Sequence, residues 1–306
     1  MSKLTRKLFL SILAVVLTVF ALGSTTFAWF TLTNTSTVQA FEAQVIGDSG
    51  IEISLGAHAT VFADPDDAEW VTTLTTADVE AYLVDTYGNT QIFNHVTTAD
   101  GVSFSTLGAT ALAATTGGYI ELPLNFRSDT ATKINWTTVS LSSAGNAWTV
   151  DTAFTDESGE ARVPGDQINV DASNAMRVAM VSDAAYGGKT VAYEKPATGN
   201  NIVLGIGGDL SNGGTGDNGA MNYYFSKNNA LPFDADAVTT LTTITDLAGG
   251  QEVVVLDDVT ASANDFGADY YGQLTVRIWL EGWDANAYNS ILSQFVSTSF
   301  TFQGVA

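Results

Sequence analysis

The sequence predicts an all-β protein: an antiparallel β-sandwich of jelly-roll type, with a few short helices and an apolar signal helix at the N-terminus. Beyond residue 28 the chain is rich in Thr, Val, Ala, Ser, Gly and Asn and has only five prolines, which favours strands over helices. Apolar and polar residues alternate over many short segments, as in half-buried antiparallel strands. No βαβ rhythm is visible, which argues against a parallel sheet. Many short strands with Gly, Asn and Asp turns indicate a sandwich.

Period-2 alternation predicts the strands individually. The clearest is Leu274–Leu280, whose even-numbered residues are all apolar, and Val296–Gln303 closes the chain with another. The same pattern occurs in Phe41–Val45, Ile51–Leu55, Ile120–Asn125, Ile134–Ser140, Met176–Val181 and Val253–Val255.

Helices are expected to be short and few. Residues Thr76–Leu83 begin with a Thr suited to capping and carry an acid in the first turn. Asp284 is a candidate cap for a second helix over Ala285–Leu292. The segment Asp171–Ala175 predicts a single helical turn before the strand at Met176.

One elaborated sandwich over residues 29–306 is the preferred domain organisation, because the segments nearest each end resemble core strands. Two polar stretches interrupt it. Gly207–Asn222 is rich in Gly and Asn and cannot bury apolar surface, which predicts a surface loop. Asp156–Glu160 is interpreted as a polar hinge, so a division into two domains near 156–166 is the alternative.

Residues 1–28 have the three-part layout of a secretory signal peptide. A basic head is followed by an apolar run from Leu8 to Leu22 and a polar stretch that leads to Ala28. The run is shorter than the roughly 20 residues that a transmembrane helix needs. Cleavage after Ala28 is therefore expected, with an uncleaved membrane anchor as the alternative.

The charge balance limits the classes of partner. The chain has 33 Asp and Glu against 11 Lys and Arg, a formal net charge of −22, and no cysteine. Binding to nucleic acid or anionic lipid needs clustered cations, so no nucleic-acid partner is expected, and membrane contact is expected only through an uncleaved signal. Without cysteine there are no disulfides, thiolate nucleophiles or Cys-based zinc sites. An acidic, cysteine-free exported chain is typical of a bacterial or archaeal exterior.

No catalytic motif was found among those for zinc hydrolysis, the serine nucleophile elbow or the phosphate-binding loop. The sequence therefore predicts a protein that is not an enzyme. The two histidines, His58 and His95, are interpreted as surface or strand-edge residues. Trp279 and Trp283 suggest a sugar-binding platform, but alternation places Trp279 on the sheet face opposite Ile278, where packing is the commoner outcome.

Calcium is the one cofactor that the acidic loops suggest, because this ion takes six to eight oxygen ligands. Ordinary solvated loops are the alternative. The candidate ligands are Asp64, Asp66, Asp67, Asp209 and Asp217.

The segment from Trp29 to Val38 is a candidate assembly strand. Phe30 and Leu32 share one face of an extended segment, and Trp29 lies on the other. Such a strand pairs either with a neighbouring subunit in trans or with its own subunit in cis.

The junction Thr25-Thr26-Phe27-Ala28-Trp29-Phe30-Thr31 resembles that of the TasA/camelysin family of secreted bacterial matrix-fibre proteins. The resemblance implies a jelly-roll subunit that is exported through a dedicated signal peptidase and built into extracellular fibres. In such fibres the mature N-terminal strand completes the sheet of the next subunit. Camelysins have been classed as metalloproteases, whereas this sequence has no recognisable zinc motif.

The sequence thus predicts a secreted structural protein, extracellular or at the cell surface, that polymerises into surface fibres or biofilm matrix. Its expected partners are copies of itself and, during export, a signal peptidase. The alternative is a surface-exposed module that binds carbohydrate or another cell through the loops around Asp66 and Asp217.

We expect mass spectrometry of the exported protein to find Trp29 as its first residue. A species that retains Met1 and stays embedded in the membrane would contradict the signal peptide and favour the anchor.

Overall fold

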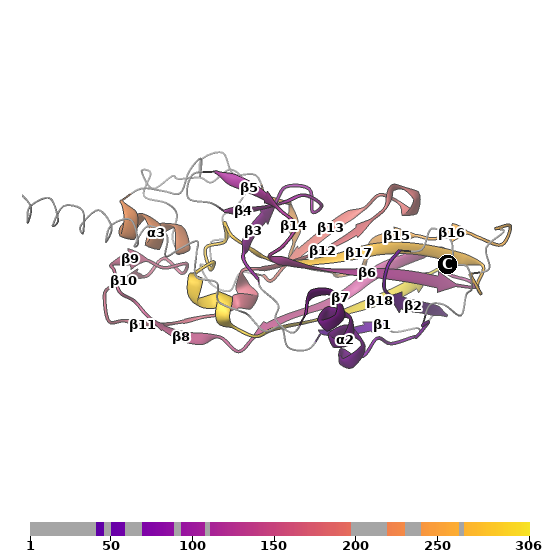
Figure 1. The fold of residues 1–306 in the computed structure, drawn as a ribbon, viewed down its shortest axis with the longest axis horizontal. Helices are drawn as coiled ribbons and strands as arrows, with labels where there is room; N and C mark the ends of the chain where they lie inside the picture. The colour runs from indigo at the N-terminus through magenta and orange to yellow at the C-terminus, as the bar shows by residue number, and fades with distance from the viewer. Residues whose placement is uncertain are drawn as a thin grey trace, which may run out of the picture.

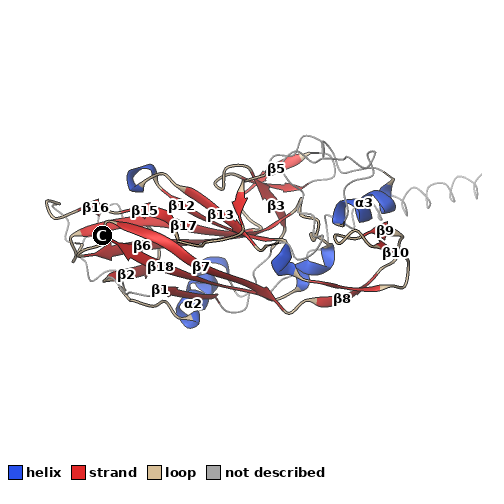
Figure 2. Cartoon of the chain, turned by 180° about the vertical axis from the view of Figure 1, so that it is seen from behind, coloured by secondary structure: helices blue, strands red, loops and turns tan. Residues whose placement is uncertain are grey.

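Two facing β-sheets form the body of the protein (Figure 1). The computed structural model describes residues 41–45, 50–58, 69–88, 93–107, 111–196, 219–229, 240–262 and 266–306. The described part is mostly strand, with two α-helices and three short 3₁₀ helices (Figure 2). The predicted all-β class is therefore confirmed.

The first sheet has four strands in the order β1-β18-β7-β15. Their bounds are β1 Phe41–Val45, β18 Val296–Val305, β7 Lys133–Ser143 and β15 Gln251–Val255. β1 runs parallel to β18, while the other two pairs are antiparallel.

The second sheet is built around β17, Tyr270–Glu281. On one side β17 pairs with β12, followed by β13 and β14; on the other it pairs with β6, which pairs with β2. At its C-terminal end β17 also pairs with β3, followed by β4 and β5, and near its start with β16. The bounds are β2 Ile51–Leu55, β3 His95–Thr98, β4 Phe104–Leu107, β5 Leu112–Thr115, β6 Tyr119–Ser128, β12 Met176–Ser182, β13 Thr190–Glu194, β14 Thr243–Ile244 and β16 Asp257–Asp258.

Two small ribbons and the helices complete the described structure. The ribbons pair β8 (Asn146–Thr149) with β11 (Gln167–Val170) and β9 (Phe154–Thr155) with β10 (Ala161–Arg162). The helices are α2 Thr76–Tyr87, α3 Ala220–Asn228, η2 Ala172–Asn174, η3 Ala184–Tyr186 and η5 Asn289–Ser293.

Aromatic side chains join the two sheets in the core. Phe126 of β6 meets Phe302 of β18 edge to face, with ring centroids 5.3 Å apart. Trp136 of β7 lies between Phe300 of β18, at 6.2 Å, and Tyr193 of β13, at 6.0 Å. Aromatic pairs in these arrangements contribute beyond the area that they bury, so they help to hold the sheets face to face.

All eight segments with predicted strand alternation are strands in the structure. The predicted helix at Thr76 is α2, capped by Thr75, whose hydroxyl and backbone form a capping box with Asp78. The turn at Asp171–Ala175 is confirmed as η2, with the Asp171 carboxylate accepting the Ser173 N–H. Parallel pairing was not expected, yet β1–β18, β13–β14 and β17–β3 are parallel.

The predicted helix over Ala285–Leu292 is wrong. Asp284 is fully buried; its Oδ2 pairs with Arg177, and its Oδ1 accepts the Asn286 N–H at 2.8 Å, which caps a turn and not a helix. Only the short η5 forms in this segment. A buried carboxylate needs a charged partner as well as local N–H groups, and Arg177 provides that partner.

The structure differs from the prediction at both polar stretches, Gly207–Asn222 and Asp156–Glu160. Residues 220–222 of the expected surface loop belong to α3, and residues 207–218 lie outside the described part. Asp156, in the predicted hinge, is buried and organises the β9–β10 turn. Its Oδ1 accepts N–H groups from Ser158 and Glu160, and its Oδ2 accepts the Arg162 Nε–H at 2.6 Å.

Gly219 links α3 to the buried segment after Asp284. Its φ is +81°, and a Cβ placed there would lie 2.2 Å from the Ala285 carbonyl oxygen, which accepts the Ala220 N–H. Gly88, after α2, has a similar φ of +80° but open space around its Cβ position. Both glycines therefore need a positive φ, but only Gly219 lacks room for a side chain.

We expect Gly88→Ala to lower the free energy of unfolding by about 1–3 kcal/mol, the cost of a non-Gly residue in this backbone region. Gly219→Ala should cost about 1–3 kcal/mol more, because the new methyl group clashes with the Ala285 backbone. Urea denaturation of both variants measures the difference. Equal losses would mean that the close approach at Gly219 does not matter.

Candidate functional site

The site residues predicted from the sequence lie outside the described residues. They are Ala28, Trp29, Phe30, Leu32 and Val38 at the N-terminus and the calcium candidates Asp64, Asp66, Asp67, Asp209 and Asp217. Their assignments stay predictions. What the structure does describe is the body to which the predicted assembly strand is joined.

β1 is the outermost described strand on one side of the first sheet. β1 follows the predicted assembly strand after two residues and pairs with β18, with Phe41 opposite Thr298 and Val45 opposite Phe302. Among the described residues, β1 has no strand on its other side. Figure 1 shows β1 and β15 on opposite sides of β18 and β7.

A groove lies at the opposite edge of the same sheet. β15 pairs with β7 only between Lys133 and Trp136, although β7 continues to Ser143. Next to the point where β15 begins, a cavity of about 570 Å³ opens beside β7, a volume typical of binding pockets. Its lining comprises Thr137, Thr138, Val139, Tyr193, Gln303 and residues 245–250.

A β-bulge shapes β7 at this point. Trp136 is opposite Phe302 and Thr138 is opposite Thr301, so Thr137 is an extra residue on β7. The buried Trp136 indole donates its Nε1–H to the Thr138 carbonyl at 2.8 Å. Bulges bend a strand and are common at sheet edges and binding sites.

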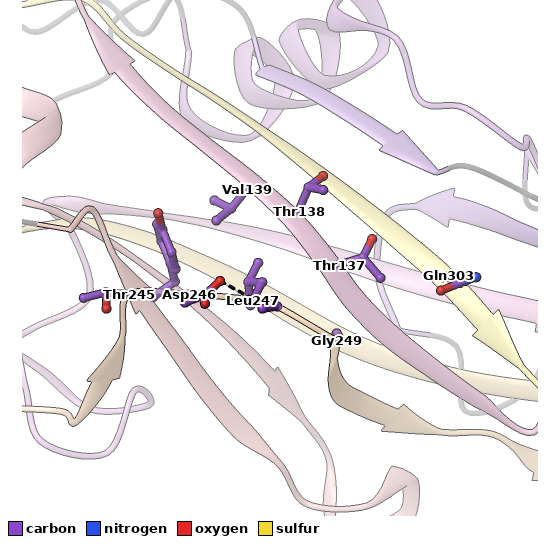
Figure 3. A pocket seen from close by; sticks show the side chains of 11 residues that line it. Thr137, Thr138, Val139, Thr245, Asp246, Leu247, Gly249 and Gln303 are labelled. Carbon is purple, nitrogen blue, oxygen red and sulfur yellow. Dashed lines mark hydrogen bonds between the residues drawn. The ribbon is translucent and has the colours of Figure 1, made fainter.

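The loop across the groove is held by local contacts. The Asp246 carboxylate accepts the Ala248 N–H at 2.8 Å, and Gly250 has a φ of +76° and lies close to the Thr137 side chain. Figure 3 shows Val139 on the side of β7 that faces the loop with Asp246 and Leu247. Burial and the Asp246 charge raise the pKa of the Tyr193 phenol. The groove thus combines an apolar wall, hydroxyl groups and a strand edge with one carboxylate.

Another group of polar side chains is buried beside the C-terminal end of β17. Arg177 is 3% exposed, and its guanidinium pairs with Glu194 and Asp284, each at 2.7 Å. The same guanidinium donates to the Met176 carbonyl at 3.1 Å. Removing one partner of such a buried pair leaves the other charge uncompensated, so the group ties β12, β13 and the segment after β17 together.

Glu281 lies in the same interior. Its carboxylate accepts the Trp279 indole N–H at 3.0 Å and the Trp283 backbone N–H at 3.2 Å. Burial raises the pKa of Glu281 above its ordinary value of 4.5, because the charged form loses its hydration. Glu281 is therefore stabilised in its protonated form.

The two histidines differ. His58 is half-buried, with Nε2 2.8 Å from the Leu274 carbonyl oxygen. His95 is buried at the start of β3, so the surface position expected for it is wrong. Burial lowers its pKa to about 4, and this histidine is neutral at physiological pH.

The sugar-platform interpretation is also wrong, because Trp279 and Trp283 are 1% and 2% exposed. Trp279 packs edge-on against Phe104, with ring centroids 5.5 Å apart, on the sheet face opposite Ile278, as the alternation predicted. Neither indole is available to stack on a ligand.

In the ranges that the structure covers, no group of three or more His, Asp or Glu side chains is placed to hold a metal ion. No helix within those ranges is long and apolar enough to cross a membrane.

Comparison of the chain with protein-family models, with curated proteins and with solved structures found no match. The resemblance to the TasA/camelysin family therefore stays a prediction.

Sequence reasoning missed the groove, because Thr137, Thr138 and Val139 look like ordinary strand residues. One signal was present: the alternation is longer over Ile134–Ser140 than over Val253–Val255. Two paired strands of unequal length leave part of the longer edge uncovered.

Glu281→Gln should change how stability depends on pH. A carboxyl group whose pKa is raised by folding binds protons more tightly in the folded state, so its stabilising effect is present at low pH and is lost as pH rises from 4.5 through its folded pKa. Gln stays neutral. The free energy of unfolding of the variant relative to wild type should therefore increase with pH above 4.5.

The control is Glu80→Gln, the same substitution on the exposed face of α2. Urea denaturation between pH 4 and 8 measures both. A difference for Glu281→Gln that does not change with pH would show that folding does not raise the pKa of Glu281.

Proposed function

We propose that this chain is an exported structural subunit of jelly-roll type that polymerises into extracellular fibres or biofilm matrix. Residues 1–28 serve as its signal peptide. The mature N-terminal strand, Trp29 to Val38, is donated to the neighbouring subunit, and calcium in the acidic loops remains an optional ligand.

The observation that carries this proposal is the position of the two edges of the first sheet. The strand that follows the donor segment, β1, lies at one edge, and the groove beside Val139 lies at the other. A contact between different surfaces of identical subunits is head-to-tail, and it continues into an open filament where the rotation does not close a ring. This arrangement supports a fibre.

The chemistry of the donor segment suits the groove. Phe30 and Leu32 provide apolar side chains for the groove, where Val139 is half-buried and Tyr193 and Leu247 are buried against the core. Burying each of them contributes on the order of 1.5–3 kcal/mol. The donor backbone pairs with the uncovered β7 edge, as in other cases of strand addition. The segment carries no charge, so no charged group has to be desolvated when it binds.

Two variants separate donor from acceptor. A chain that starts at Gln39 lacks the donor strand and keeps the groove. Val139→Lys, in a chain that starts at Trp29, keeps the donor and places a charge in the groove. We expect each protein alone to be a folded monomer by sedimentation velocity and circular dichroism, because each lacks one half of the contact.

A mixture of the two proteins should form a one-to-one dimer and no longer species, because only one donor and one acceptor remain. The matched control is Val163→Lys, at a valine that is 56% exposed away from the groove, which should polymerise as wild type does. Normal polymerisation of the Gln39 chain, its failure to fold as a monomer, or the absence of a dimer in the mixture would each contradict donor-strand assembly.

A further inference from the structure

The hairpin β4–β5 presents an uncharged outer edge of the second sheet. β5 pairs with β4, with Phe104 opposite Thr115 and Leu107 opposite Leu112, and within the described residues it has no strand on its other side. Leu112 is 46% exposed, and the next two residues, Ala113 and Ala114, are exposed as well. Residues 101–120 contain no charged side chain.

Aromatic contacts between β4 and buried residues fix the position of this hairpin. Phe104 of β4 stacks on Tyr119, with ring centroids 3.9 Å apart and ring planes 15° apart, and meets the buried Trp279 at 5.5 Å. The hairpin therefore extends from a packed cluster that also includes Val96 and Ala192. A strand edge fixed in this way is ready to pair without further ordering.

β5 is short, at four residues, which is one protection of an edge strand, but three others are missing from it. Natural proteins block such edges with charged side chains, proline or a bulge. β5 has no charge and no proline, and its pairing with β4 is regular. An exposed edge of this kind is a site for strand addition.

Charge determines which partner fits. Three of the 11 Lys and Arg residues precede Trp29, and each of the other eight forms an ion pair with an acid of the same molecule. These eight are Arg127, Lys133, Arg162, Arg177, Lys189, Lys195, Lys227 and Arg277.

The remaining surface charge is therefore acidic, and two copies repel each other except where their surfaces are neutral. A basic partner would instead be drawn to the acidic surface. The uncharged β5 edge thus suits a second copy of the same chain.

We propose that β5 pairs antiparallel with β5 of a second copy, across a two-fold axis. A pair of four-residue strands is a small contact, so it is weak between single subunits. Repeated along a fibre it becomes strong through multivalency. β5 belongs to the second sheet, whereas the proposed fibre contact uses the two edges of the first. The β5 contact therefore leaves the fibre contact free and joins fibres side by side; this last step rests on the proposed function, whereas the pairing itself does not.

Disulfide crosslinking tests the pairing in the chain that starts at Trp29, which has no cysteine of its own. Ala113→Cys and Ala114→Cys are oxidised singly and as an equal mixture, which covers the registers centred on or between these residues. We expect a covalent dimer to form at least 10-fold faster than for the exposed control Val163→Cys. Crosslinking no faster than the control would overturn the proposal. Crosslinking of Ala113→Cys to a Phe30→Cys chain that is faster than crosslinking between two β5 strands would also overturn it, because it would place the N-terminal strand at this edge.

Ala113→Lys tests the consequence for fibres, with Val163→Lys as the control of equal charge. Microscopy should show single fibres for Ala113→Lys and laterally joined fibres for the control and the wild type. Equal bundling in all three would overturn the role in lateral joining. If the wild type forms no fibres, the proposed function fails, while the crosslinking result still decides the β5 pairing.

Discussion

The described fold depends on β17 being buried on both of its faces. Leu274, Val276, Ile278 and Leu280 point into the main core, while Trp279 packs in a smaller cluster on the other side. Polar residues of β17 are therefore enclosed and need partners. Arg277 donates to Glu121 and to the Gly101 carbonyl, at 2.7 and 2.8 Å, and Glu281 accepts two N–H groups. Without these bonds, burial of the same groups would cost several kcal/mol.

Ion pairs within the molecule determine which charges remain on its surface. Each Lys and Arg of the described part pairs with an acid of the same molecule, as Arg177 does with Glu194 and Asp284. The acidic side chains that remain on the surface therefore find no unpaired Lys or Arg on the described surface of a second copy. The contacts that we propose between copies use uncharged surface: the segment Trp29–Val38, the groove beside Val139 and the β5 edge all have little or no charge. Salt screens the remaining repulsion, so assembly should become easier as ionic strength rises.

Much of the fold could be predicted because alternation is a local signal. The strand at Leu274–Leu280 and the helix at Thr76 follow from neighbouring residues alone. Asp284 could not be assigned correctly, because its partner Arg177 is 107 residues away and nothing local marks the pair. His95 was misplaced for a related reason: a polar residue at the start of a short strand looks exposed until a parallel pairing with Leu280 encloses it. The groove depends on the unequal lengths of two strands that are distant in sequence, and alternation does not reveal which strands are neighbours.

In the proposed fibre, the chain alone provides both the donor strand, Trp29–Val38, and the acceptor groove beside Val139. Negative-stain electron microscopy of the purified chain starting at Trp29, at physiological ionic strength and without any other protein, tests it most directly. We expect long filaments of uniform subunit repeat. Separate particles of monomer size, unchanged as protein and salt concentrations rise, would contradict it.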